Sequence, residues 1–114
     1  MRPCFFAAGN EEWLAHDAAL QAVLGHEPTR EQVAASLAWD NCTNHAVDLF
    51  APQVETAVSV ADAAITSCGL EMVRYMAALG IQYPESVREA TLPQLTARVM
   101  AIRAARQLMN SKSR

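Results

Sequence analysis

The side chains that could carry chemistry gather between positions 40 and 48 of this sequence. Cys42 and His45 are three residues apart, so on a helix they are neighbours. A thiol beside an imidazole is the pairing that Cys-His nucleophilic catalysis needs. The helical pattern, however, turns Cys42 toward an apolar face and His45 toward its flank, and no nearby residues offer an obvious oxyanion hole. The sequence therefore predicts that this protein is not an enzyme.

Metal binding is the other chemistry that this segment suggests. His45 could share an ion with Asp48 at i, i+3 spacing, or with Asn41 at i, i+4 spacing. Two ligands from one helix make a weak site, and the chain has no companion Glu-x-x-His or His-x-x-x-His motif. It also has no C-x-x-C pair for zinc and no glycine-rich loop for phosphate. We therefore predict no metal and no cofactor.

A helix from Thr29 to Phe50 is expected to position these residues. Thr29 and Gln32 form a capping box, in which each side chain satisfies a backbone N–H group of the other residue. Small and apolar residues fall on one face of this helix, and polar residues fall on the opposite face and its flanks. We call the polar set the polar ridge, which consists of Asp40, Asn41, Asn44, His45 and Asp48.

The polar ridge has an unusual composition for an exposed helix face. Such faces are rich in Lys and Glu, whereas the ridge has only Asp, Asn and one His. Short side chains lose little conformational entropy when they are ordered, which suits a contact surface. Asn is also a weak helix former, so its presence carries a small cost. We predict that the polar ridge binds a partner; a plain solvated face is the alternative.

Helical periodicity extends over most of the remaining chain, and no segment alternates for long enough to form a strand. We expect one domain over 1–114, an all-α compact bundle of four to six helices, with 1–9 and 110–114 poorly ordered. The first helix is expected at about 10–24, with Asn10 as its N-cap. A later helix is expected to begin with Pro52 in its first turn; Gly69 interrupts its pattern, and Gly80 ends it. Further helical segments are expected at 84–90 and, after a Thr91–Gln94 capping box, up to about Met109, whose side chain is expected to face inward.

Three features of the core follow from the apolar stripes. Trp39 is expected to anchor the core, because the chain has few large side chains. His16 lies within an apolar stripe and is interpreted as a satisfied core residue. A Met-rich stripe after Gly69 is expected to pack in the core, with an adaptable binding groove as the alternative. Its residues are Met72, Tyr75, Met76 and Leu79.

Charge is distributed unevenly along the chain. The net charge is −3, but residues 1–70 carry −7 and residues 71–114 carry +4. The simplest interpretation is that the basic last helix docks on the acidic first part of the same chain. A pI near 5.5 opposes phosphate binding, so nucleic acid is not expected as the main partner. The alternative is a nucleic-acid-associated regulator that uses Arg98, Arg103, Arg106 and Lys112.

The three cysteines, Cys4, Cys42 and Cys68, are far apart in sequence and odd in number. Cys42 and Cys68 lie on apolar helix faces, where a free thiol behaves as a small hydrophobe. We therefore expect no disulfide and a cytoplasmic location. The N-terminal apolar run is too short for a signal peptide, and no run is long enough to span a membrane.

The pattern Trp39-x-x-Cys42-x-x-His45-x-x-x-Leu49-Phe50, followed by an Ala-rich helix over 55–65, resembles part of the small all-helical immunity proteins of bacterial toxin systems. The resemblance covers about 30 residues and implies a cytoplasmic protein that neutralises a toxin by binding it. It assigns no catalytic residues. A looser likeness, in 92–105, is to small helical proteins associated with secretion systems.

These observations favour a non-enzymatic protein-binding module, and a toxin-neutralising immunity protein or inhibitor is the most specific interpretation. The acidic side chains of the polar ridge would suit a basic toxin, because opposite charges speed association and set specificity. A second alternative to this function, besides the nucleic-acid regulator, is a ligand-binding bundle or minor enzyme with a pocket near His16 and Trp39. No membrane contact is expected, and assembly with a second copy is left open.

Overall fold

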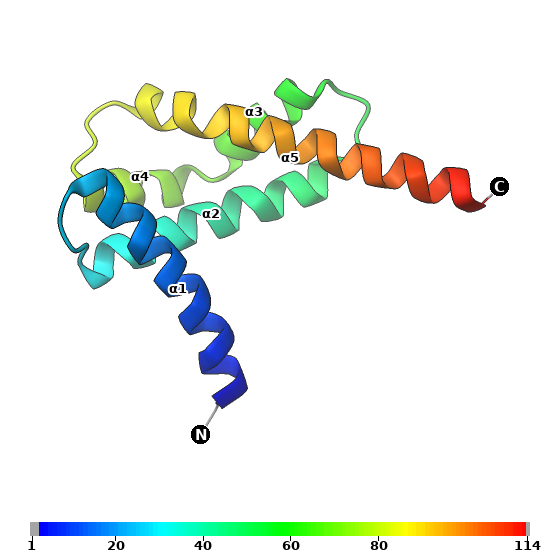
Figure 1. Cartoon of the computed structure of the whole chain (residues 1–114). Coiled ribbons are helices and arrows are strands. Elements are labelled where there is room, and N and C mark those ends of the chain that lie inside the picture. The colour runs from blue at the N-terminus through cyan, green and yellow to red at the C-terminus, as the bar shows by residue number, and fades with distance from the viewer. Residues whose placement is uncertain (1–2, 114) are drawn as a thin grey trace.

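The computed structural model describes residues 3–113, with the side chains of 11–112. These residues form five helices and no strand, so the predicted all-α bundle is confirmed (Figure 1). No helix in this part of the chain combines the length and apolar character needed to cross a membrane. The helices are α1 (Pro3–Leu24), α2 (Arg30–Phe50), α3 (Ala57–Ser67), α4 (Gly69–Leu79) and α5 (Pro84–Ser113).

Helix α2 is the central element, and its predicted capping box is confirmed. The hydroxyl of Thr29 accepts from the N–H of Gln32 at 3.1 Å, and the Gln32 side chain accepts from the N–H of Thr29 at 2.9 Å. The helix ends at Phe50 with Ala51 as C-cap. Pro52 follows the cap and has no N–H with which to continue the helical hydrogen bonds.

The core lies where α2, α3 and α5 meet. Trp39 is 3% exposed, as predicted for a core anchor. Its ring stacks on that of Tyr75 at a centroid distance of 6.2 Å, and its indole N–H donates to the Thr91 hydroxyl at 3.3 Å. The Met-rich stripe of α4 packs against this core through Met72, Tyr75 and Met76, which favours the packing interpretation over the groove. The other core residues are mostly small or β-branched: Ala46, Val47, Ala51, Val60, Ala61, Ala64, Ile65, Cys68, Val87 and Val99, with Leu95.

Two helix ends project from this core. Figure 1 shows the first half of α1 and the last turns of α5 extending away from the other helices. The radius of gyration is accordingly 16.1 Å, where a sphere-like domain of this length would have about 13 Å. Near its end, α5 exposes Leu108 and Met109. The expectation that Met109 faces inward was therefore wrong.

The loop between α2 and α3 corrects the prediction that Pro52 begins a helix. Helix α3 begins at Ala57, with Thr56 as N-cap. Arg103 of α5 donates to three backbone carbonyls of this loop, those of Ala51, Gln53 and Glu55, at 3.0, 2.6 and 2.7 Å. These bonds satisfy carbonyls that have no helical partner, and no local pattern in the sequence indicates them.

Helix α5 is continuous, so the predicted break and second capping box near Thr91 were wrong. Thr91 lies inside the helix and its hydroxyl accepts from Trp39 rather than from a cap N–H group. Pro93 also lies inside the helix, where it has no N–H to bond the carbonyl four residues earlier. Burial of the Val87, Leu95 and Val99 side chains supplies the packing that keeps the two halves as one helix.

Helix α1 begins at Pro3 rather than at Asn10. Proline fits a first turn, because its missing N–H would have no helical partner there. Among the side chains that the structure describes, Leu20 of α1 is buried, and the guanidinium of Arg30 at the start of α2 lies 5.9 Å from the ring centroid of Trp13. Val23, near the end of α1, is 82% exposed. Residues 1–9 and 110–114 were predicted to be poorly ordered. Residues 3–9 and 110–113 lie in α1 and α5, and Met1, Arg2 and Arg114 lie outside the described residues.

Cys42 and Cys68 form a disulfide, which corrects the prediction of free thiols. Helix α2 and the junction of α3 with α4 meet so that the two Cα atoms are 6.1 Å apart, a separation that a disulfide bridges. The side chain of Cys4 is outside the described residues. The prediction of a cytoplasmic location rested in part on free cysteines, and the disulfide removes that support.

Helix α5 docks on the acidic first part of the chain, as the charge distribution predicted. Arg98 binds Asp48 of α2, and Arg88 binds Asp62 of α3. These contacts involve exposed side chains, so each adds only a few tenths of a kcal/mol up to about 1 kcal/mol. Their main effect is that several acidic groups are already paired within the chain.

Candidate functional site

The polar ridge does not form one free acidic surface. Asp48 accepts three hydrogen bonds from the guanidinium of Arg98, at 3.0 to 3.2 Å. Its charge is therefore balanced by α5. Asp40, about two turns earlier on the same helix, faces α1 instead. The two carboxylates that were expected to meet a basic partner are thus occupied by different elements of this chain.

The middle of the polar ridge remains available. Asn41 and His45 are exposed, and Asn44 is half-buried. No described residue makes a side-chain hydrogen bond or ion pair with these three residues in the structure. Leu49, one turn after His45, is 60% exposed and adds an apolar group to the same stretch of α2.

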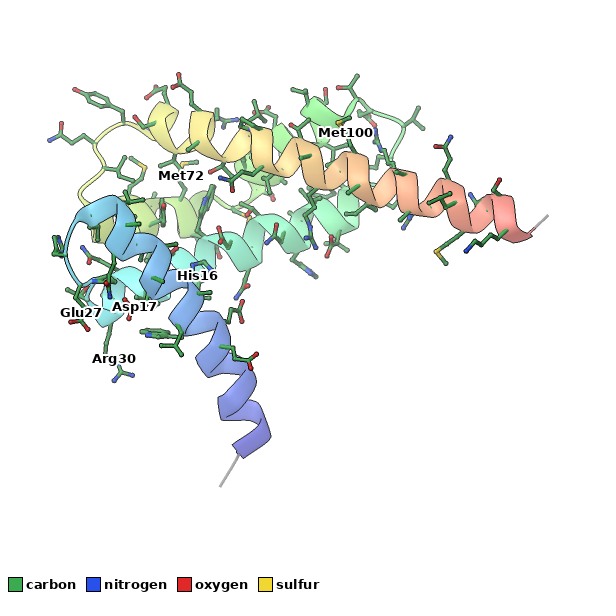
Figure 2. All side chains as sticks on the ribbon, viewed as in Figure 1. His16, Asp17, Glu27, Arg30, Met72 and Met100 are labelled. Carbon is green, nitrogen blue, oxygen red and sulfur yellow. A yellow bond between two sulfur atoms is a disulfide. The ribbon has the colours of Figure 1, made fainter. Side chains whose placement is uncertain are left out.

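A cleft of about 390 Å³ opens between the second half of α1 and the other helices. Its apolar walls come from α1, and its polar groups come from four helices. Figure 2 shows His16 on α1 at the side of that helix which faces α2. This is where the sequence suggested a pocket near His16 and Trp39, since Trp39 stacks on Tyr75 at the cleft. The lining consists of Ala15, His16, Ala19, Leu20, Val23, Ser36, Asp40, Tyr75 and Gln94.

His16 connects two residues of α2. Its Nδ1 lies 2.9 Å from the hydroxyl of Ser36, and its Nε2 lies 3.3 Å from a carboxylate oxygen of Asp40. Ser36 and Asp40 are four residues apart, so they lie one above the other on the same helix face. His16 is satisfied by hydrogen bonds, as predicted, but it lines a cleft rather than the closed core.

The cleft changes the acidity of two of its groups. Burial raises the pKa of Asp40; the charge of His16 opposes this shift, and the nearby Glu12 carboxylate adds to it. Burial also raises the pKa of Tyr75, and the negative charge of Asp40 raises it further. The charge of Asp40 therefore acts on Tyr75 where water is partly excluded. Shifted groups in a cleft are a common mark of functional sites.

Ser36, His16 and Asp40 are linked by the two contacts of the imidazole. They have the residue types of a nucleophile, a base and an orienting acid. Ser36, however, is only 8% exposed and lies within α2, where neighbouring backbone N–H groups are committed to helix hydrogen bonds. Acyl transfer needs free donors aimed at the developing oxyanion. The arrangement can hold a polar ligand group, but it lacks the donors that would stabilise a tetrahedral intermediate.

No family model, curated protein sequence or solved structure matches this chain. The case for a function therefore rests on the geometry. The sequence singled out Asp40 and His16, but for separate roles. Tyr75 was placed in the Met-rich stripe and Gln94 in a capping box, and Ser36 was missed. The i, i+4 spacing of Ser36 and Asp40 was visible in the sequence. The approach of His16 to both was not, because it depends on how α1 crosses α2.

Proposed function

We propose that this protein is a non-enzymatic binding protein, and that its cleft holds a small organic cation with an apolar part. One observation carries this proposal: the Asp40 carboxylate lies in a partly dehydrated cleft whose described lining includes no Lys or Arg. The ion partner of Asp40 is the His16 imidazole, at 3.3 Å. A carboxylate that has no Lys or Arg beside it attracts a positively charged ligand more strongly where water is partly excluded.

The remaining lining suits such a ligand. Ala15, Ala19 and Leu20 offer an apolar wall on α1, while Tyr75 contributes a ring and a hydroxyl from α4. A volume near 390 Å³ is at the small end of the range of about 300–1,000 Å³ that is usual for ligand pockets. An ammonium group could bond Asp40 while its hydrocarbon part covers the alanine wall.

Matched amines and carboxylic acids with the same short apolar tail test this proposal. We expect ligand-detected NMR to find binders among the amines and none among their acid counterparts. Asp40→Asn should weaken amine binding by about tenfold or more, because a hydrogen bond to a charged group contributes about 1.5–3 kcal/mol. Asp17→Asn is the matched control, since Asp17 is an acidic residue of α1 that does not line the cleft.

The pH dependence supplies a second readout in the same experiment. The amine stays charged across the acidic range, where Asp40 loses its negative charge. The pKa of Asp40 is raised above the ordinary 3.8, and binding should fall as the pH falls through that raised pKa. Equal binding of amines and acids, or unchanged affinity in Asp40→Asn, would contradict the proposal.

A protein partner is the second candidate function, and the exposed middle of the polar ridge favours it. Asn41, His45 and Leu49 combine short polar groups with an apolar side chain on one stretch of α2. This fits the resemblance to immunity proteins. A basic toxin is a weaker choice than the sequence suggested, because Asp48 is paired with Arg98 and Asp40 faces into the cleft beside His16.

Growth rescue tests the protein partner. If an adjacent gene encodes a toxin, co-expression with this protein should protect cells, and Leu49→Arg should abolish protection by placing a charge at the contact. Leu70→Arg is the control, because Leu70 is also an exposed leucine but lies on α4. Full protection by Leu49→Arg would remove this face of α2 from consideration.

A further inference from the structure

Cys42, Cys68 and Glu71 form a cluster of side chains that is separate from the cleft, since none of the three lines it. Cys42 comes from α2, Cys68 lies at the junction of α3 and α4, and Glu71 is in the first turn of α4. The two sulfur atoms and a carboxylate oxygen all lie within 4.8 Å of one another. Cys68 is buried and the other two residues are half-buried.

The Glu71 carboxylate is the unusual member of this cluster. Among the described residues it makes no hydrogen bond or ion pair, whereas Glu31, Asp48 and Asp62 each bind an arginine. Its place in the first turn of α4 is favourable for a negative charge, because the helix dipole is positive there. That position explains why a carboxylate is stable beside the sulfurs, but it leaves the carboxylate oxygens free.

We propose that Cys42, Cys68 and Glu71 form a redox-gated metal site, which the disulfide closes and which binds Zn²⁺ when the disulfide is reduced. In the opening step a dithiol supplies two electrons and two protons to the Cys42–Cys68 bond and itself becomes a disulfide. In the binding step Zn²⁺ displaces the two thiol protons, which pass to water. The ion then has two thiolate ligands and one carboxylate ligand.

The geometry needs only a small adjustment to hold the ion. Tetrahedral zinc keeps thiolate sulfurs about 3.8 Å apart, with Zn–S bonds near 2.3 Å and Zn–O bonds near 2.0–2.2 Å. Opening the disulfide lets the sulfurs separate to that distance, and the Glu71 oxygen is already within 4.8 Å of them. Cys68 is both the C-cap residue of α3 and the N-cap residue of α4, so the two helix ends act on a Cys68 thiolate in opposite directions. Three protein ligands leave the fourth position for water.

The ligands come from two parts of the fold, which makes the site dependent on folding. Cys68 and Glu71 are three residues apart and are neighbours on one helical turn, whereas Cys42 is 26 residues earlier in the chain than Cys68. A purely structural disulfide makes a different prediction. In that case reduction would weaken the fold and create no site for an ion.

Cobalt titration of the full chain tests this proposal, because thiolate-bound Co²⁺ has an intense charge-transfer absorption. The protein carries Cys4→Ser, is reduced with a dithiol and is desalted without oxygen. We expect the absorption to saturate at one equivalent of Co²⁺ and to disappear when Zn²⁺ is added. The oxidised protein should give no such absorption.

Glu71→Gln identifies the third ligand. It should weaken Co²⁺ binding by about tenfold or more, because even losing a residue that only hydrogen-bonds to a metal ligand lowers metal affinity by about tenfold. It should also alter the spectrum. Glu85→Gln is the matched control, since Glu85 occupies the first turn of α5 and should leave binding unchanged. Circular dichroism checks that both variants remain helical. The proposal would be overturned if the reduced protein gave no such absorption, or if Glu71→Gln bound Co²⁺ with unchanged affinity.

Discussion

Trp39→Ala is expected to lower the free energy of unfolding by about 3–5 kcal/mol. The side chain is 3% exposed, and its loss leaves a cavity among α2, α4 and α5 that the small neighbouring residues cannot fill. The variant also leaves the buried Thr91 hydroxyl without its indole donor and removes the stacking partner of Tyr75. Urea unfolding, followed by circular dichroism, should show a lower midpoint with an unchanged slope.

Trp13→Ala is the matched control for this variant. Trp13 is half-buried on α1, and its ring lies 5.9 Å from the guanidinium of Arg30. Its substitution should cost well under half as much stability as Trp39→Ala, because less apolar surface leaves the core. A loss below about 1 kcal/mol in Trp39→Ala would mean that the tryptophan is not the anchor of the core.

Cys42→Ala with Cys68→Ala is expected to lower the free energy of unfolding by about 2–4 kcal/mol. The disulfide closes a loop between residues 26 apart, and removing it restores conformational freedom to the unfolded chain. Urea unfolding of the oxidised wild type and of the double variant measures this difference. Both proteins carry Cys4→Ser and are measured with a chelator, so that neither a third thiol nor a bound metal contributes.

The reduced wild type provides the internal comparison. Under these conditions it should unfold near the midpoint of the double variant, because both lack the crosslink. If oxidised and reduced wild type have the same midpoint, the crosslink between α2 and the junction of α3 with α4 does not stabilise the fold. Mass spectrometry of a non-reduced proteolytic digest confirms which cysteines are joined.

The sequence predicted helix ends correctly where interactions within one helical turn determine them. The Thr29–Gln32 capping box and the left-handed Gly80 at the end of α4 are both present, since each depends on residues within one turn. Pro52 and Thr91 were misinterpreted because distant residues decide their surroundings. Arg103 holds the loop after Pro52, and the Trp39 indole donates to the hydroxyl that was expected to cap a helix.

The disulfide was not predictable from cysteine spacing. Cys42 and Cys68 lie on the apolar faces of their helices, which is compatible with free thiols and with a crosslink alike. Only the packing of α2 against the junction of α3 with α4 brings their Cα atoms to 6.1 Å. A 26-residue offset in the sequence aligns Cys42 with Cys68, Val47 with Val73 and Ala51 with Ala77, but such an echo does not imply contact.

The candidate site was predicted in part. Helical periodicity placed Asn41, His45 and Asp48 on the exposed side of α2, but it could not show which other helices reach the polar ridge. Helix α1 reaches Asp40 through His16, and α5 reaches Asp48 through Arg98. These crossings depend on the angles between helices, which no short-range pattern encodes.

Methyl NMR of the protein during an amine titration tests the central claim most directly. The amine is the tightest binder among the matched pairs, and the observed signals are the alanine, leucine and valine methyl groups. We predict saturable shifts at Ala15, Ala19 and Leu20, which line the cleft, and none at Leu49. Asp40→Asn should reduce these shifts at the same amine concentration. Shifts centred on Leu49, or no saturable shift at the cleft, would contradict the account.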